Sequence, residues 1–438
     1  MKRKVLFIVL MAVLSANTIL AQNTETENIQ SKKIPFSIKA YPFRGMYLDK
    51  NTHYEKFGPI FPAGVHMGLE FPSLQQRPWQ QYLGNPTVGL GLSWLDFGNP
   101  HDPGMAKLGM GVAVYPYILL DAIDTDYFQM RFKVAGGLAA VTEHWYTQED
   151  TDPDHYYEPT VNTIFGCTLN VYLNAGINLN VPVTKYLAFG TEFGYFHMSN
   201  GRVCMPNIGV NSIYGSVGLT ATLNHKETRA PKTFPDLPYG WAINLTGAAG
   251  AQKSAIKDPN RFFISSMHAG VVYHVTNWYG IGAGLDVFYN GAIDKNTDRY
   301  LYRKDRDYTF TDKVRAGLAM NNEFKFGAVT AIVDWGFYFF NPSRNYYDND
   351  HPLYGYGKRP LFYKNDGAGT DEAFHYIRFG LKCRIWDNMY LQASAKTHLH
   401  IAEYVEFGIG YQIPFLKKSE RKPGQSRIFH YRKGWWNR

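Results

Sequence analysis

The sequence predicts an all-β fold, a transmembrane antiparallel β-barrel of the bacterial outer membrane with about sixteen strands. Three observations carry this prediction. Alternating segments of about ten residues recur along the chain, as in such barrels. Aromatic residues make up 16% of the chain and charged residues only 19%, against about 25% charged in an average soluble domain. Finally, no apolar stretch after Gln22 approaches the roughly 20 residues that a membrane-spanning helix requires, so any membrane crossing is expected to use strands.

The N-terminus has the three-part pattern of a secretory signal peptide. Three basic residues within the first four positions precede an apolar run from Val5 to Leu14, and small and polar residues follow up to Ala21. We therefore expect residues 1–21 to be removed during export. A chain that leaves the cytoplasm is not expected to bind nucleic acid.

Sixteen segments alternate in the way that half-buried strands require. In the segment from Val88 to Trp94, for example, large apolar residues alternate with Gly or Ser. One face of the expected strand therefore carries large apolar side chains and the other carries small ones. The first eight expected strands are 35–44, 62–71, 87–97, 107–118, 127–142, 166–180, 184–199 and 209–224. The second eight are 239–250, 262–275, 277–289, 314–327, 329–340, 372–384, 387–398 and 402–414. The even count is typical of bacterial barrels.

A linker rich in charge and proline, residues 225–238, separates the two sets of strands. The expected organisation is a barrel half at 22–224, this linker on the periplasmic side, a second barrel half at 239–415 and a basic C-terminal tail at 416–438. Small inward residues favour two narrow, filled barrels of eight strands, whereas the rarity of two membrane barrels in one chain favours a single barrel of sixteen. We leave both arrangements open, with a slight preference for one barrel.

Connection lengths give the barrel an orientation. The links after odd-numbered strands are mostly long, such as 143–165 and 341–371, and those after even-numbered strands are mostly short, with 72–86 as an exception. Outer-membrane barrels place long loops outside the cell and short turns in the periplasm. The segment between His197 and Asn211 is therefore expected at the cell exterior.

Charge and cysteine content narrow the partners. The formal net charge of +8 suits attraction to anionic lipid phosphates, although the basic tail that holds much of it has the character of a solvated segment. The three cysteines, Cys167, Cys204 and Cys383, indicate neither a disulfide scaffold nor a cysteine-based metal site. Outer-membrane lipids are the expected partners, and the oligomeric state stays open.

His197 and Ser199 form the candidate catalytic pair. They are two residues apart on an expected strand, so their side chains share a face, as a general base and the nucleophile that it activates require. The odd-numbered residues that precede them, including Phe189, Phe193 and Tyr195, are apolar. The pair therefore lies on the greasy, lipid-facing side, which suits an enzyme whose substrate is a lipid ester.

The stretch around this pair resembles the PagL-type lipid A 3-O-deacylases of the bacterial outer membrane. The signature of that family is His-x-Ser-Asn, then Pro-Asn-x-Gly, then a Glu that opens the last strand. The chain matches it at His197, Ser199, Asn200, Pro206, Asn207 and Gly209. It departs at the last position, where Asn211 replaces the Glu. The resemblance covers roughly residues 36–224 and is specific only around this motif.

The resemblance implies an outer-membrane esterase that removes an ester-linked acyl chain from lipid A, in lipopolysaccharide, without a cofactor or metal. Ser199 would be the nucleophile and His197 the general base, since an unperturbed histidine pKa of about 6.5 suits that task. Asn211 would orient the imidazole through its carbonyl, as Asn does in Cys-His-Asn sites. For the developing oxyanion, the resemblance implies donors at Asn200, Gly201 and Asn207.

The competing interpretation is a non-catalytic outer-membrane barrel, either a porin or a structural protein with a degenerate site. His197 and Ser199 would then be interfacial polar residues at a strand end, and Pro-Asn-x-Gly would be ordinary turn chemistry. The second half of the chain ends in a similar way, near His398 and Glu403, but without a serine nucleophile. We expect that half to be structural.

Overall fold

The computed structural model describes most of the strand-forming part of the chain. The described residues are 35–48, 60–73, 85–98, 105–147, 160–224, 240–293, 309–342, 375–398 and 401–414, except 255, 257, 277 and 387, together with 80, 83 and 158. The expected signal peptide at 1–21, the linker at 225–238 and the basic tail at 416–438 lie outside the described residues. Within the described residues, no helix is long and apolar enough to cross a membrane.

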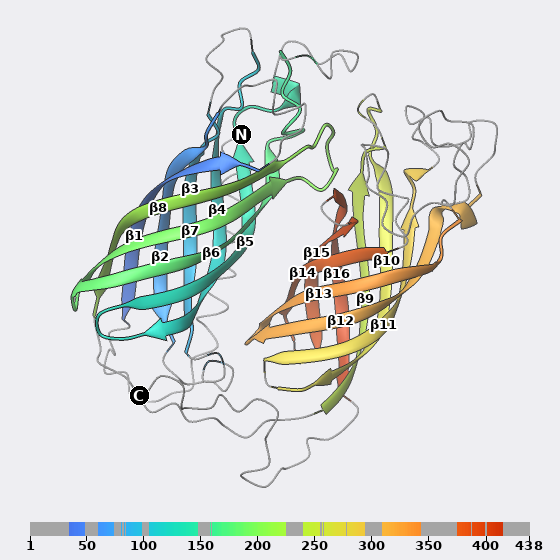
Figure 1. Cartoon of the computed structure of the whole chain (residues 1–438). Coiled ribbons are helices and arrows are strands. Elements are labelled where there is room, and N and C mark those ends of the chain that lie inside the picture. The colour runs from blue at the N-terminus through green and yellow to red at the C-terminus, as the bar shows by residue number, and fades with distance from the viewer. Residues whose placement is uncertain are drawn as a thin grey trace, which may run out of the picture.

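Two closed antiparallel barrels, each of eight strands, lie side by side (Figure 1). The first contains β1 (Phe36–Tyr47), β2 (Ala63–Pro72), β3 (Thr87–Asp96), β4 (Met110–Asp124), β5 (Gln129–Val141), β6 (Leu169–Thr184), β7 (Leu187–Ser199) and β8 (Val210–Leu223). The second contains β9 (Gly240–Gln252), β10 (Phe262–His274), β11 (Tyr279–Asn290), β12 (Val314–Phe326), β13 (Val329–Phe340), β14 (His375–Arg384), β15 (Met389–His398) and β16 (Ile401–Pro414). Short 3-10 turns at Trp145–Thr147 and Thr311–Lys313 lie in connections.

The all-β barrel with sixteen strands is confirmed, and of the two arrangements left open the chain adopts two barrels. The slight preference for a single barrel is wrong. β8 returns to pair with β1, from Phe36 opposite Leu223 to Tyr47 opposite Ser212, so the first barrel has no free edge for β9. The second barrel closes in the same way, by pairing of β16 with β9. Closure removes the unpaired strand edges that a membrane does not tolerate.

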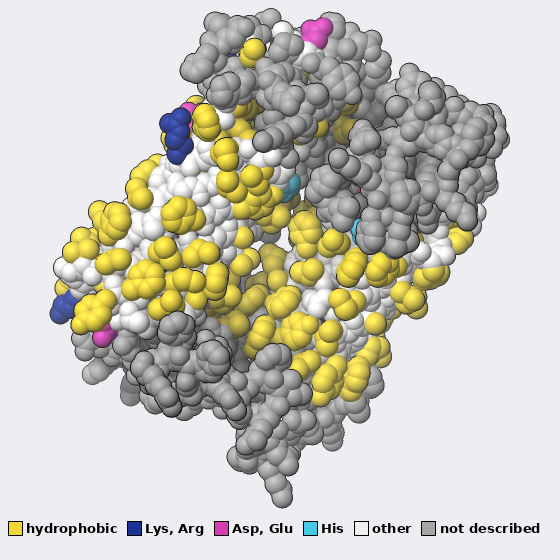
Figure 2. All heavy atoms as spheres, in the orientation of Figure 1, with side chains coloured by type: hydrophobic (Ala, Val, Ile, Leu, Met, Phe, Trp, Pro, Cys, Tyr) yellow, Lys and Arg dark blue, Asp and Glu magenta, His cyan; other side chains and the backbone are white. Residues whose placement is uncertain are grey.

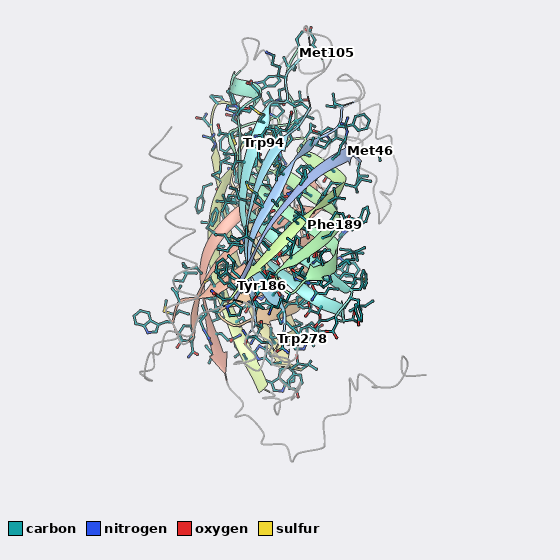
Figure 3. The ribbon with its side chains drawn as sticks, turned by 90° about the vertical axis from the view of Figure 1, so that its left-hand side faces the viewer. Met46, Trp94, Met105, Tyr186, Phe189 and Trp278 are labelled. Atoms are coloured by element: carbon teal, nitrogen blue, oxygen red, sulfur yellow. The ribbon has the colours of Figure 1, made fainter. Side chains whose placement is uncertain are left out.

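On the side that Figure 2 shows, apolar side chains gather on the outward walls of both barrels. The outward residues of β7 and β8 include Phe193 and Val217, which are 58% and 54% exposed. Figure 3 shows the same direction for Trp94 and Phe189. Because side chains alternate between the two faces of a strand, the residues between these apolar outward ones point into the buried interior of the barrel.

Packed side chains fill the first barrel. Glu192 accepts hydrogen bonds from Lys133 Nζ at 2.7 Å and from the Tyr214 hydroxyl at 2.5 Å. Lys39 Nζ lies between Glu192, at 3.4 Å, and Glu70, at 3.1 Å. Aromatic residues pack between these ion pairs and the loop end, among them Phe43, Tyr115, Tyr172 and Phe196. An eight-stranded barrel is just wide enough to be filled in this way.

The interior of the second barrel also contains buried charges. Arg378 is within 2.9 Å of Asp286, 3.2 Å of Glu406 and 3.6 Å of Asp334, and Asp286 accepts a further hydrogen bond from the Tyr376 hydroxyl at 2.6 Å. Each charge is therefore compensated in the low-dielectric interior, as a buried ion requires. Two filled interiors do not resemble the aqueous channel of a porin.

The short turns lie at the end of the barrels opposite the β7–β8 connection. The β6–β7 turn is tighter than the sequence suggested, because β6 continues to Thr184 and only Lys185 and Tyr186 remain outside the strands. The Thr184 hydroxyl accepts hydrogen bonds from the backbone N–H groups of Tyr186 and Leu187, both at 3.1 Å. The β7–β8 connection at 200–209 thus belongs to the end with the long loops, the end that outer-membrane barrels place at the cell exterior.

Candidate active site

The candidate site lies on the outer wall of the first barrel, where β7 ends and β8 begins. His197 and Asn211 stand directly opposite each other in the β7–β8 pairing. Their parity is that of the lipid-facing Phe193 and Val217, so both side chains leave the barrel wall on the outside. Ser199 is the last residue of β7 and shares that face.

The three side chains form a hydrogen-bonded series. His197 Nε2 is 2.9 Å from Ser199 Oγ, and His197 Nδ1 is 2.7 Å from Asn211 Oδ1. Since a carbonyl oxygen only accepts, Nδ1 carries the proton, and in a neutral ring Nε2 is then left to accept the serine hydroxyl. This tautomer is the one that a general base beside a nucleophile needs.

Tyr195 adds a contact that the sequence did not indicate. Its hydroxyl donates to Asn211 Oδ1 at 2.6 Å, so this oxygen receives both the Tyr195 O–H and the His197 N–H. With Tyr195 and His197 Nδ1 both donating, the amide keeps its oxygen toward them; a flipped amide would instead need both groups to accept. Tyr195 counted only as an apolar residue in the sequence. Its hydroxyl could have indicated this contact, because Tyr195 lies two residues before His197 on the same face and diagonal to Asn211 across the strand pair.

The loop after Ser199 folds back on itself around Asn200. The backbone N–H of Asn200 donates to Asn207 Oδ1 at 3.0 Å, and Asn200 Oδ1 accepts from the backbone N–H of Cys204 at 3.2 Å. Asn207 therefore acts on Asn200 through its side-chain oxygen. Pro206 and Gly201 lie in the same turn, and Gly201 has a φ of +60°.

Asn200 retains one unused donor. Its side chain is 4% exposed, and in the part of the chain that the structure describes its Nδ2 atom has no hydrogen-bond partner. A buried donor without a partner destabilises a fold by about 1–3 kcal/mol. Such a group requires an explanation. One explanation is that the group donates a hydrogen bond to a negative charge that forms in the transition state.

Gly209 shapes the floor of the site. It has a φ of +75°, and a Cβ atom there would lie 2.7 Å from the Met198 carbonyl oxygen and 3.1 Å from Ser199 Cβ. Its N–H donates to the Ile164 carbonyl at 2.9 Å. Both the backbone conformation and the close approach to Ser199 therefore require glycine here.

Glu192, the acidic residue of β7, does not join the series. Glu192 points into the barrel, as its parity predicts, and is fully buried against Lys133 and Lys39. Among the described residues, no group of three or more His, Cys, Asp or Glu side chains is placed to hold a metal ion.

Two family models match the chain. The one described as Lipid A 3-O-deacylase (PagL) matches residues 63–220, and the one described as Acyloxyacyl hydrolase, C-terminal domain, matches residues 241–355 and 361–416. Together they cover most of the chain. The chain belongs to the PagL family. It is accordingly an outer-membrane lipid A 3-O-deacylase, an ester hydrolase, and the expectations of family, activity class and location are confirmed.

The PagL model covers β2 to β8 of the first barrel, and the C-terminal model covers the second barrel. No curated protein matches the chain. Among solved structures, the outer-membrane enzyme PagL is 14% identical, with 42% of this chain and 98% of that chain covered and a TM-score of 0.26. A mutant of the Rh. blastica porin is 11% identical over 86% of this chain and 99% of its own, with a TM-score of 0.17.

The P. putida toluene transporter TodX is 7% identical, with 89% of this chain and 90% of that chain covered and a TM-score of 0.16. TM-scores this low support no inference about this chain. The barrel topology rests on its own strand pairing, and the family assignment rests on the two family models.

Proposed function

We propose that this PagL-family enzyme removes the 3-O-linked acyl chain of lipid A by a serine–histidine mechanism, with Ser199 as nucleophile and His197 as general base. The observation that carries the proposal is the hydrogen-bonded series from Ser199 through His197 to Asn211 on the lipid-facing wall. Related series, Ser-His-Asp/Glu and Cys-His-Asn, serve acyl transfer on unrelated folds.

In the first half of the reaction, Ser199 Oγ attacks the ester carbonyl carbon while its proton moves to His197 Nε2. The tetrahedral intermediate then breaks its bond to the leaving sugar oxygen, and the imidazolium returns the proton to that oxygen. In the second half, water attacks the acyl-Ser199 ester, with His197 again taking and returning one proton. The products are a free fatty acid, a deacylated lipid A and the unchanged enzyme.

Asn211 and Tyr195 hold the imidazole ready for these transfers. Asn211 Oδ1 keeps the Nδ1–H in place at 2.7 Å, and the Tyr195 hydroxyl keeps the amide oxygen turned toward it. A neutral amide stabilises the imidazolium less than a carboxylate does, so the replacement of the family Glu by Asn211 is expected to slow the reaction without abolishing it.

The oxyanion site is proposed at the start of the β7–β8 loop. Asn200 Nδ2 is the buried donor that a negative oxygen would satisfy. Asn207 fixes Asn200 by accepting its backbone N–H, and Gly201 supplies the left-handed turn that follows. In this assignment the side chain of Asn200 is the donor, and Asn207 and Gly201 position it.

The location of the site suits a lipid ester. Ser199 ends β7 at the exterior side of the wall, where the outer-leaflet ester bonds lie close to the head groups, and the outward residues along the strand, such as Phe193 and Phe189, are apolar. An acyl chain can therefore run along the wall while the ester reaches Ser199. The second barrel, residues 239–415, is proposed to carry no catalytic series of its own.

Covalent labelling tests the assignment of the nucleophile. A fluorophosphonate that carries a long alkyl chain should phosphonylate Ser199 of the folded enzyme in detergent, with loss of fluoride, and peptide mass mapping should find the label there. His197→Ala should suppress the labelling, because the serine then has no base. Labelling of another serine, or equal labelling in the His197 variant, would refute the proposal.

A further inference from the structure

The second barrel touches the loop that follows the proposed nucleophile. We call residues 200–209 the catalytic loop and residues 253–261, between β9 and β10, the bridging loop. The backbone N–H of Lys253 donates to the Arg202 carbonyl at 3.0 Å, and Arg202 Nη2 donates to the Ser254 carbonyl at 3.4 Å. The backbone of Arg202 is thus hydrogen-bonded to Lys253 of the second barrel, and its side chain is hydrogen-bonded to Ser254.

Arg261 makes the second pair of contacts. Its Nε donates to the Val203 carbonyl at 2.8 Å and its Nη2 to Cys204 Sγ at 3.3 Å. The side-chain contact with Cys167 and the neighbouring Arg261 guanidinium both lower the pKa of the Cys204 thiol from its usual value. Because the donor of the second contact is a guanidinium, this hydrogen bond is charge-assisted and stronger than a neutral one.

The wall of the second barrel contacts the catalytic loop at Gly201. A Cβ atom on Gly201 would lie 2.4 Å from Cγ2 of Val405, on β16. The glycine therefore permits both a φ of +60° and contact with the second barrel at van der Waals distance. This contact is separate from the hydrogen bonds of Lys253 and Arg261.

These contacts lead directly to the proposed oxyanion donor. Val203 and Cys204, whose carbonyl and sulfur Arg261 holds, use their own N–H groups to bind the backbone oxygen of Asn200 at 3.3 Å and its Oδ1 at 3.2 Å. Asn200 follows Ser199 in the chain. Because the direction of the Asn200 amide depends on its Oδ1 contact, anything that fixes Cys204 also fixes the free Nδ2 donor.

We propose that the second barrel positions the catalytic loop of the first, with Arg261 as the main positioning residue and Lys253 and Val405 as supporting contacts. The inference rests on the proposed function of Ser199 and Asn200. It gives the second barrel a role in the reaction although no catalytic series is proposed there. A shift of about 1 Å in a reacting group can lower a rate by about 10²-fold, so a loop held at several points has a large effect on catalysis.

Steady-state kinetics of the full chain test this role. Arg261→Ala should lower kcat on purified lipid A in detergent by about tenfold or more while KM changes little, and Arg261→Lys should recover part of kcat, since an ammonium group can still donate to Val203. Arg384→Ala, which removes an exposed arginine at the opposite end of the same barrel, is the matched control and should be unchanged. Heat-modifiable gel migration checks that each variant is folded.

The outcomes separate this inference from the mechanism. Full kcat in Arg261→Ala, while Ser199→Ala is inactive, would overturn the positioning role and leave the mechanism intact. A raised KM with unchanged kcat would also overturn it, because Arg261 would then bind substrate phosphate. Activity in Ser199→Ala would instead refute the mechanism on which the inference rests.

A steric pair tests the barrel contact if the arginine variant fails to fold. Gly201→Ala should lower kcat strongly, and Val405→Ala in the same chain should restore part of it by removing the clashing methyl group. Val405→Ala alone trims this contact without adding a clash, so it should lower kcat much less than Gly201→Ala does. The backbone strain at residue 201 is present in both Gly201 variants, so the recovery isolates the contact between the barrels. No recovery would count against the proposal.

Discussion

Asn211 stands directly opposite His197 across the β7–β8 pairing, with its Oδ1 atom 2.7 Å from His197 Nδ1. It occupies the place at which the PagL signature has a glutamate. The chain thus has the geometry of the proposed catalytic series, with a neutral residue at its end. Substitutions at residue 211 can therefore test its role directly.

Loss of either member of the central pair should remove nearly all ester hydrolysis. Ser199→Ala deletes the proposed nucleophile and His197→Ala deletes its proposed base, and in a related triad either change lowers kcat by about 10⁶-fold. Both side chains lie on the outer wall, so barrel folding should persist, as judged by heat-modifiable migration. The measurement is release of fatty acid from purified lipid A in detergent. Full activity in either variant would contradict the assigned role.

Asn211 should tune the rate without being essential. Asn211→Ala removes the acceptor for Nδ1–H and should slow hydrolysis, whereas Asn211→Glu restores a charge that stabilises the imidazolium and should raise kcat. In a related triad, loss of the acidic member lowers kcat by about 10⁴-fold, which bounds the effect. Side-by-side kcat values of the three proteins check this. A slower Asn211→Glu enzyme would show that the site is built for an amide.

Tyr195 should matter only while residue 211 is an amide. Tyr195→Phe removes the donor that keeps the Asn211 oxygen toward His197, and it should lower kcat by roughly threefold to tenfold, the effect of about one hydrogen bond. In an Asn211→Asp background the same change should have little effect, since both carboxylate oxygens accept. A double-mutant cycle measures this difference. Equal losses in both backgrounds would rule out the orienting role.

The oxyanion assignment predicts a loss in kcat at Asn200. Asn200→Ala should lower kcat by about 10²–10³-fold with little change in KM, as removal of one oxyanion donor does in other esterases and proteases. Asn200→Asp is the sharper variant, because it keeps the shape and the Oδ1 acceptor but replaces the Nδ2 donor. It should be as inactive as the alanine variant. An active Asn200→Asp enzyme would exclude this donor.

Stability should depend on the ion pairs inside the first barrel. Glu192→Gln leaves Lys39 and Lys133 without their shared carboxylate, and removal of one member of a buried pair destabilises by about 3–5 kcal/mol. The temperature at which the folded gel band converts should fall. Lys185→Ala, in the β6–β7 turn, is the control and should stay within about 0.5 kcal/mol. An unchanged transition in Glu192→Gln would mean that the pair contributes little.

Much of the fold could be predicted from the sequence, because the alternation of residues in a strand is a local pattern. The sixteen strands follow from period-2 patterns, and the outward direction of His197 and Asn211 follows from the same parity. The number of barrels was not readable, because it depends on whether β8 pairs with β1 or with β9, and these edges lie far apart in the sequence. The alternation is the same in both cases.

The site was readable only in part for a similar reason. His197, Ser199 and Asn211 lie on strands, where parity fixes direction. Asn200 and Asn207 lie in a loop, and which of them presents a free donor depends on the turn that brings Cys204 back to Asn200. The contacts of Arg261 cross between barrels, and no local pattern in the sequence indicates them.

The most direct test of the central claim is the mass spectrum of lipid A from cells that produce either the unchanged enzyme or Ser199→Ala at equal levels in the outer membrane. The account predicts loss of one 3-hydroxyacyl mass from lipid A with the unchanged enzyme, and an intact lipid A with Ser199→Ala. The same loss in both strains would contradict it.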